Sequence, residues 1–271
     1  MADPAVAPGV DGITVKVGLS RISVALHGAG GVVAIRTTGT PVRGEGERLA
    51  KFFSSLWPDL DLNGLPGALV SVVPDLSPVL ERLWRARFGT LLRPFDLSRA
   101  PFSSEDYSFG ALGADRGASI WGAVARHGPR LGQSFMVADF GTHTVTTVLC
   151  RGRILGGTIL PGLGLTIGAV GGGRVLQEQR EAPGRGRVVP SELRGLRAIA
   201  RGTREGILSG AVLGSVAAVE GLRSRAEREV EEPLGLVLTG GLSPLLARFF
   251  SQNPPVDRQL LHHGARCFLL A

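Results

Sequence analysis

Short stretches in which apolar and polar residues alternate occur in two separate parts of the chain. Such alternation is typical of strands that bury one face, and the glycines between the stretches favour tight turns. Longer stretches with apolar residues every three or four positions predict helices. The predicted strands lie at 13–37 (three strands), 68–73, 134–139, 144–150, 153–160 and 235–239. The predicted helices lie at 45–57, 77–87 (with Ser77 as a candidate N-cap), 115–126, 203–229 and 243–250.

A meander of three strands followed by alternating helices and strands therefore occurs twice. This order predicts an α/β protein made of two similar halves, with a cleft between them. We expect a flexible tail at 1–12, an N-terminal domain at 13–112 and a C-terminal domain at 113–271.

The composition narrows the class of protein. With 271 residues, of which 44% are hydrophobic and 20% charged, the chain can bury a core without disulfides or metals, and intrinsic disorder is excluded. There is no continuous apolar run of membrane-spanning length and no basic-then-apolar N-terminus. We therefore expect no membrane partner, a cytoplasmic location, and free thiols at Cys150 and Cys267.

The formal net charge is +7, which raises the question of a nucleic-acid partner. Lys16 and Lys51 are the only lysines, and the arginines are spread along the chain instead of forming one stripe. This distribution favours a solvated surface, so we do not expect a nucleic-acid partner.

Three glycine-containing turns follow predicted strands. The first, Asp139-Phe-Gly-Thr-His-Thr144, combines an acid that can hold a cation with threonines that can hold phosphate oxygens. The other two, Gly156–Leu163 and Thr239–Pro244, each lead from a strand into a helix, where backbone N–H groups can bind an anion. Each could instead be a tight turn without a ligand, but three together favour a nucleotide site.

The motif Gly113-Ala-Asp-Arg116 starts a predicted helix after a long loop. Asp115 could take a proton from a hydroxyl, and Arg116 could bind a carboxylate. The alternative is a solvated surface pair. His262 and His263 have no cluster of acidic residues nearby that could complete a metal site, and we expect them at the surface.

Taken together, these motifs resemble the type III pantothenate kinases, also called the Bvg accessory factor family. The resemblance runs from about residue 13 to the C-terminus. Its carriers are Ser71–Pro74, Gly113–Arg116, Asp139–Thr142, Gly156–Gly162, Gly202-Thr203 with Ser209-Gly210, and Thr239–Gly241. It implies duplicated ribonuclease-H-like domains of the acetate-and-sugar-kinase/actin superfamily. It also implies phosphorylation of pantothenate by ATP, the first step of coenzyme A synthesis, by a dimer that uses potassium or ammonium.

The resemblance also implies roles for single residues. Asp115 would be the general base on the pantothenate hydroxyl. Thr142 would contact ATP phosphate, Asp139 would coordinate the monovalent cation, and Gly240 and Gly241 would lie near the adenosine. The residues that would hold pantothenate are Tyr107, Gly113, Ala114, Arg116 (on the carboxylate) and Thr203.

The chain departs from the family in its first phosphate turn. The family has Asp-x-Gly-Asn-Thr there, whereas this chain has Lys16-Val-Gly-Leu-Ser20. Gly18 is kept and Ser20 replaces threonine, but an ammonium group cannot ligate magnesium and would repel it. Phosphoryl transfer depends on charge neutralisation, so we expect a loss of orders of magnitude in rate and no magnesium site of the family's kind.

Several interpretations of Lys16 stay open. The chain could be a degenerate homologue that binds ligands with weak or no turnover. It could be one subunit of a mixed dimer whose partner, an intact paralogue, keeps the metal turn. Alternatively, Lys16 could contact the phosphates itself and partly replace the metal, or the chain could be a non-catalytic regulatory protein.

Overall fold

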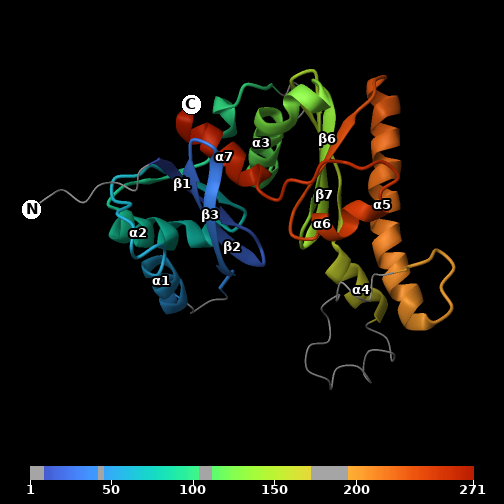
Figure 1. Cartoon of the computed structure of the whole chain (residues 1–271), viewed down its shortest axis with the longest axis horizontal. Helices are drawn as coiled ribbons and strands as arrows, with labels where there is room; N and C mark the ends of the chain where they lie inside the picture. Colours follow the sequence, from blue (N-terminus) through green and yellow to red (C-terminus); the bar gives the residue numbers. More distant parts are fainter. Residues whose placement is uncertain (1–8, 42–45, 104–111, 172–194) are drawn as a thin grey trace, which may run out of the picture. The chain divides into compact units, whose positions relative to one another are not determined.

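The computed structural model describes residues 9–41, 46–103, 112–171 and 195–271. They form two compact units (Figure 1). Unit 1 comprises Met1–Pro129 and Gln259–Ala271, and unit 2 comprises Arg130–Arg258. Each unit is described by itself.

Unit 1 is built on a five-stranded sheet in the order β3-β2-β1-β4-β5. Its strands are β1 (Val10–Val17), β2 (Arg21–Gly28), β3 (Gly31–Gly39), β4 (Gly67–Ser71) and β5 (Leu92–Pro94). The first three form an antiparallel meander, β4 pairs parallel with β1, and β5 pairs parallel with β4. The strand-rich start of the chain and its parallel return strand are thus as predicted.

The two faces of this sheet differ in character. Alternate side chains of β1, including Ile13 and Val15, enter an apolar core with α1 (Gly46–Ser54) and α2 (Ser77–Phe88). Thr14 and the other residues of opposite parity lie on the second face, against α7 (Leu260–Leu270). Unit 1 therefore has one apolar face and one face that carries polar groups.

Two helices of unit 1 cross at a pair of glycines. Gly122 lies on α3 (Ala114–Leu131) and Gly264 lies on α7. A Cβ at Gly122 would overlap the carbonyl oxygen of Leu260, and a Cβ at Gly264 would overlap that of Ala118. The backbones of α3 and α7 thus touch, and this contact requires glycine at both positions.

We expect Gly264→Ala to destabilise the protein by about 3 kcal/mol, because the added methyl group must separate two packed backbones. The measurement is the free energy of unfolding in urea. Gly221→Ala is the control, since a Cβ at this helical glycine of unit 2 meets no atom within 4 Å. A loss in Gly264→Ala no larger than in Gly221→Ala would contradict the described crossing.

Unit 2 repeats the sheet of unit 1. Its strands are β6 (Phe135–Phe140), β7 (His143–Cys150), β8 (Arg153–Gly156), β9 (Ile159–Pro161) and β10 (Gly235–Thr239). β6, β7 and β8 form an antiparallel meander, β10 pairs parallel with β6, and β9 adds to β7. Val256 bridges Leu238 in the parallel sense, at the position that β5 occupies in unit 1. The fold is therefore a duplicated α/β unit.

The helices of unit 2 are α4 (Leu163–Gly171), α5 (Thr203–Val230) and α6 (Ser243–Leu246). By length and composition alone, α5 could cross a membrane. Its buried residues, among them Val212, Val216 and Val219, pack instead on the sheet of unit 2 with Met136 and Phe140. This packing is that of a core helix.

Some predicted details differ from the structure. The strand β1 starts at Val10, inside the expected tail, of which residues 1–8 lie outside the described part. Ser77 does not cap its helix, because a 3-10 turn at Pro74–Leu76 precedes it and makes it the first helical residue. The predicted helix 243–250 is short and continues as a 3-10 turn at Ala247–Phe249.

The compact units also do not follow the expected boundary between 112 and 113. The first helix after that boundary, α3, packs with unit 1 up to Pro129. The C-terminal residues from Gln259 return to unit 1, because α7 covers the second face of its sheet.

Candidate active site

The clearest candidate site of unit 2 lies where β6 and β10 end. Asp139, the penultimate residue of β6, pairs with Thr239 of β10 and Val145 of β7. A Cβ at Gly240 would overlap both Asp139 Oδ1 and the carbonyl oxygen of Phe140, and Gly240 has φ +90°. Asp139 Oδ1 and the Phe140 carbonyl oxygen, which accepts from the Leu242 N–H at 3.1 Å, therefore pack against a turn that requires glycine. The Asp139 carboxylate is the group of this turn that could ligate a cation.

The motif Gly156–Gly162 supports the Gly141-Thr142 turn. The Gly162 N–H donates to the Thr142 carbonyl at 3.1 Å, and a Cβ at Gly162 would overlap that oxygen. Gly157, with φ +158°, lies equally close to the backbone of Thr146. These glycines allow close approach between strands and turns, a structural role that the sequence analysis, which linked the motif to anions, missed.

The other predicted residues of unit 2 are exposed. Thr142 lies at the tip of the β6–β7 turn, and nothing lies within 4 Å of a Cβ at Gly241. Thr203 is exposed in the first turn of α5, after the extended Gly202. The structure thus brings Asp139, Gly240 and the Gly141-Thr142 turn together, whereas none of these contacts involves Thr203.

In unit 1, Lys16 occupies the position that Asp139 occupies in unit 2. Lys16 pairs with Ser23 of β2 and Val70 of β4. Lys16 and Asp139 each lie one position before the end of the central strand of their unit. In the following turn, the Gly18 N–H donates to Arg21 O at 2.9 Å, while Ser20 is exposed. The same turn of the duplicated fold is therefore cationic in unit 1 and acidic in unit 2.

The half-buried Lys16 forms no ion pair with a carboxylate of the described residues. On the same face of the sheet lies a buried polar network. Thr14 Oγ1 lies 2.8 Å from His27 Nε2 and 2.7 Å from His262 Nδ1, and Ser23 Oγ lies 2.8 Å from His262 Nε2. The surroundings of Lys16 are therefore neutral, which suits an anion and not a divalent cation.

Both histidines of the network are neutral in the folded protein. Burial, with the positive charge of neighbouring groups, lowers the pKa of His27 to about 4 and that of His262 well below its ordinary value. The Nδ1 atom of His27 has no partner among the described residues. An unpaired acceptor is cheaper than an unpaired N–H, so we assign His27 Nε2–H as donor to Thr14, and Thr14 as donor to His262.

The expectation that His262 and His263 lie at the surface is wrong, because they are only 4% and 7% exposed. They lie on α7, a helix that the sequence analysis did not predict. Its signal was the helical spacing of apolar residues at Leu261, Ala265 and Phe268, after Pro254-Pro255.

The predicted base Asp115 is in the first turn of α3. Its Oδ1 accepts from the Arg116 N–H at 2.8 Å, and a Cβ at Gly113 would lie 2.7 Å from it. The carboxylate is half-buried and favoured by the helix dipole. Ala114 and Arg116 belong to the same turn, whereas Tyr107 lies outside the described residues. The geometry leaves Asp115 Oδ2 available to accept a proton.

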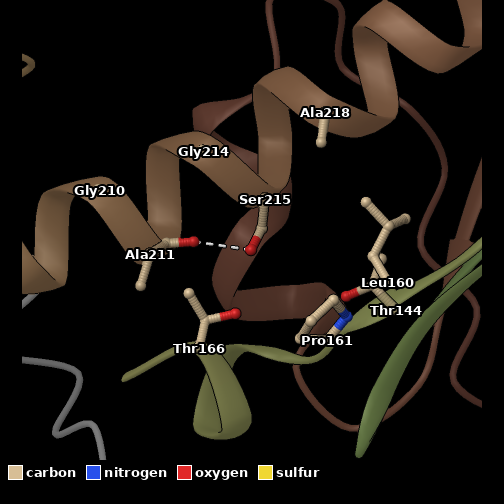
Figure 2. A pocket seen from close by; sticks show the side chains of 9 residues that line it. All are labelled: Thr144, Leu160, Pro161, Thr166, Gly210, Ala211, Gly214, Ser215 and Ala218. Atoms are coloured by element: carbon tan, nitrogen blue, oxygen red, sulfur yellow. Dashed lines mark hydrogen bonds between the residues drawn. The ribbon is translucent and has the colours of Figure 1, made fainter. Parts of the chain in front are cut away.

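Unit 2 also contains a pocket of about 210 Å³ between the β7–β9 pair, α4 and α5 (Figure 2). No charged residue lines it. Its lining residues are Thr144, Leu160, Pro161, Thr166, Gly210, Ala211, Gly214, Ser215 and Ala218.

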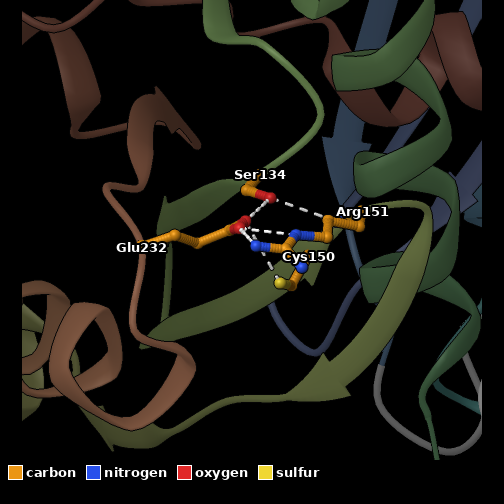
Figure 3. A network of polar contacts seen from close by, with 4 residues as sticks. All are labelled: Ser134, Cys150, Arg151 and Glu232. Carbon is orange, nitrogen blue, oxygen red and sulfur yellow. Dashed lines mark hydrogen bonds and ion pairs between the residues drawn. The ribbon is translucent and has the colours of Figure 1, made fainter.

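A polar cluster fastens the end of α5 to the β7–β8 turn (Figure 3). Glu232 accepts hydrogen bonds from Ser134, from Arg151 Nε at 2.6 Å and from Cys150 Sγ at 3.3 Å. Burial raises the pKa of the Cys150 thiol, which keeps it protonated and a poor nucleophile. Cys150 and Cys267 are free, as predicted, and the cluster is structural.

Comparisons with known proteins agree with these observations. The family model described as type III pantothenate kinase matches residues 13–225. The type III pantothenate kinase of Thermomicrobium roseum is 31% identical over 209 residues, which cover 73% of this chain and 72% of that protein. That of Acidiphilium cryptum is 33% identical over 213 residues, with coverage of 76% and 74%.

Solved structures support the fold. A protein from Campylobacter jejuni assigned to the Baf family of transcriptional activators has a TM-score of 0.59 at 16% identity, covering 95% of this chain and 97% of that one. A ROK family glucokinase from Streptomyces griseus has a TM-score of 0.51 at 11% identity, with coverage of 95% and 98%. The predicted fold class, an α/β fold of two repeated domains, is confirmed by the two sheets and by these structures.

Proposed function

The chain belongs to the type III pantothenate kinase family, and we propose that it binds ATP and pantothenate but turns them over weakly or not at all on its own. The observation that carries this proposal is Lys16, which stands at the position of Asp139 in the duplicated fold. Two turns of the same design thus differ by a reversal of charge. The second turn keeps the chemistry of a phosphate and cation site, and the first does not.

In the proposed reaction, Asp115 takes the proton of the pantothenate hydroxyl as the hydroxyl oxygen attacks the γ-phosphorus of ATP. The bond from that phosphorus to the bridging oxygen breaks, and ADP leaves. Arg116 binds the carboxylate of pantothenate, together with contacts from the Gly113-Ala114 backbone, Tyr107 and Thr203. These roles follow the family, and the half-buried Asp115 with an available Oδ2 supports the first of them.

The residues differ in how they fit the cations of the family. Asp139 suits potassium or ammonium, because its carboxylate supplies an oxygen ligand beside the glycine turn at Gly240. Thr142 would contact the phosphates beside them, and Gly240 and Gly241 the adenosine. The first turn does not fit magnesium, since Lys16 provides no oxygen and repels the ion.

As to partners, we propose a dimer in the cytoplasm, formed either by two copies of this chain or with an intact paralogue. A mixed dimer would give Asp115 or Thr203 a role in a site whose metal turn comes from the other chain. A regulatory role without catalysis stays a further alternative.

A second candidate is an active kinase in which Lys16, with Gly18 and Ser20, contacts the phosphates directly. The absence of an ion-pair partner for Lys16 among the described residues favours it. Under this alternative, turnover would be robust, because Lys16 would partly replace the divalent cation.

The experiment measures ligand binding and turnover separately. We expect calorimetry to show that ATP and pantothenate bind in potassium buffer, and coupled assays to show little or no pantothenate-dependent ADP release. Any residual release should disappear in Asp115→Asn and persist in Asp75→Asn, an exposed acid of the same unit. Absence of ATP and pantothenate binding would overturn the proposal, and robust release would favour the second candidate.

A further inference from the structure

The first phosphate turn, between β1 and β2, is fastened by a threonine that directly follows β3. The half-buried Thr40 donates its hydroxyl to the carbonyl oxygen of Gly18 at 2.6 Å. It also donates its backbone N–H to the carbonyl oxygen of Ser20 at 3.1 Å. One residue outside the turn therefore engages the carbonyl groups on both sides of Leu19.

Unit 2 fastens its matching turn with the backbone. There Gly162, which follows β9, donates its N–H to the carbonyl oxygen of Thr142 at 3.1 Å. A Cβ at Gly162 would overlap the carbonyl oxygens of Gly141 and Thr142. Glycine has no hydroxyl, so the second hydrogen bond that Thr40 makes in unit 1 has no counterpart at Gly162.

This second hydrogen bond fixes the direction of the N–H of Leu19. The peptide bond between Gly18 and Leu19 is trans, so its C=O and N–H groups point in opposite directions. Because Thr40 holds the Gly18 carbonyl on its own side, the Leu19 N–H points away from Thr40. Leu19 is exposed, and its N–H donates to no backbone carbonyl of the described residues. An oriented N–H of this kind suits an anion.

The side chain of Lys16 extends towards the same turn. Its Cε atom lies 3.8 Å from the position of a Cβ at Gly18, and its ammonium group forms no ion pair with any carboxylate that the structure describes. The turn thus combines a positive charge with an oriented N–H. The two carbonyl oxygens that would repel an anion are occupied by Thr40.

We propose that Thr40 is a positioning residue of the first phosphate turn. Its hydroxyl holds the Gly18 carbonyl away from the phosphate oxygens, so that these accept from the Leu19 N–H beside the Lys16 ammonium. The inference rests on the proposed binding of ATP. It uses the backbone of Leu19 and not its side chain, so it does not depend on the amide that the family carries at this position.

The experiment is calorimetry on the full chain in potassium buffer, with tripolyphosphate, ATP and pantothenate each titrated alone. Thr40→Val removes the hydroxyl at nearly the same shape and keeps the backbone N–H. We expect it to weaken tripolyphosphate and ATP at least about threefold, as the loss of one hydrogen bond does, and to leave pantothenate unchanged. Thr40→Ser keeps a hydroxyl and should bind all three ligands within about twofold of the unaltered chain.

Thr37→Val is the control, because it makes the same substitution at an exposed position of β3. A merely structural role of Thr40 would lower the urea midpoint and weaken all three ligands together. That outcome, or equal tripolyphosphate affinity in Thr40→Val and the unaltered chain, would overturn this inference alone. If the unaltered chain binds neither ATP nor tripolyphosphate, the proposed function is overturned as well.

Discussion

Lys16→Asp is expected to raise magnesium-dependent, pantothenate-dependent ADP release by at least about 100-fold over the unaltered chain. The substitution replaces an ammonium group, which repels a divalent cation, with a carboxylate that can bind one. Phosphoryl transfer gains most from neutralising the developing charge, so one restored ligand should have a large effect. The assay is coupled ADP release with potassium present and magnesium titrated.

The structure explains why this position can accept the change. Lys16 lies where unit 2 holds Asp139, so the backbone of the turn already suits an acid. The residue is half-buried and forms no ion pair within the described part of the chain, so no acid there is left unpaired by its removal. The positive charge of Lys16 also contributes to the lowered pKa of His262. Lys16→Asp would remove this positive charge from the surroundings of His262.

Lys51→Asp is the matched control, because Lys51 is the only other lysine and is exposed on α1. Lys16→Ala separates the loss of repulsion from the gain of a ligand, and Lys16→Asp with Leu19→Asn restores the family's amide as well. Should the unaltered chain turn over robustly and Lys16→Asp abolish that activity, the lysine would be a working part of the phosphate site and the degenerate interpretation would be wrong.

The strands and the duplication could be predicted because their signals are local. Alternation at 13–37 and at 134–160 reports a sheet with one buried face, and Arg151-Gly152 has the left-handed φ angles that a two-residue hairpin needs. The equivalence of Lys16 and Asp139 also follows from two similar strand-turn patterns. It becomes firm only when the pairing register of both strands is known.

Other features depend on contacts distant in sequence. The helix α7 returns to unit 1 after the whole of unit 2, so nothing near His262 shows that Thr14 and Ser23 will be its partners. The glycines of the motif at 156–162 looked like ligand-binding positions. Their small size instead allows close backbone contacts, such as that between Gly162 and Thr142. Only the three-dimensional structure shows these contacts.

The buried histidines predict a loss of stability in acid. His27 is neutral when folded, with a pKa of about 4, but in the unfolded chain it takes up a proton near its ordinary pKa of 6.5. Between these pH values the unfolded state binds more protons than the folded state. The contribution of His27 to the free energy of unfolding is therefore fully present above pH 6.5 and is lost as the pH falls towards 4. The difference corresponds to on the order of 3 kcal/mol for His27, and His262 acts in the same direction.

This pH window separates the histidines from the carboxylates. The pKa of Asp11 is lowered, first of all by its hydrogen bond with Arg266, so its contribution is lost only below its ordinary pKa of 3.8. The charges that surround the two histidines, from Lys16, His263 and Arg266 against Asp11, on balance also disfavour protonation. A decline that begins near pH 6 therefore reports the network of Thr14, His27 and His262.

The measurement is the free energy of unfolding in urea at intervals from pH 7.5 to 4. His27→Gln, which cannot titrate, should flatten the slope by up to about 1.4 kcal/mol per pH unit, the value for one proton. His143→Gln is the control, because that ring lies outside the network. If His27→Gln declines as steeply as the unaltered chain, His27 does not protonate on unfolding, and its burial on the α7 face of the sheet would be wrong.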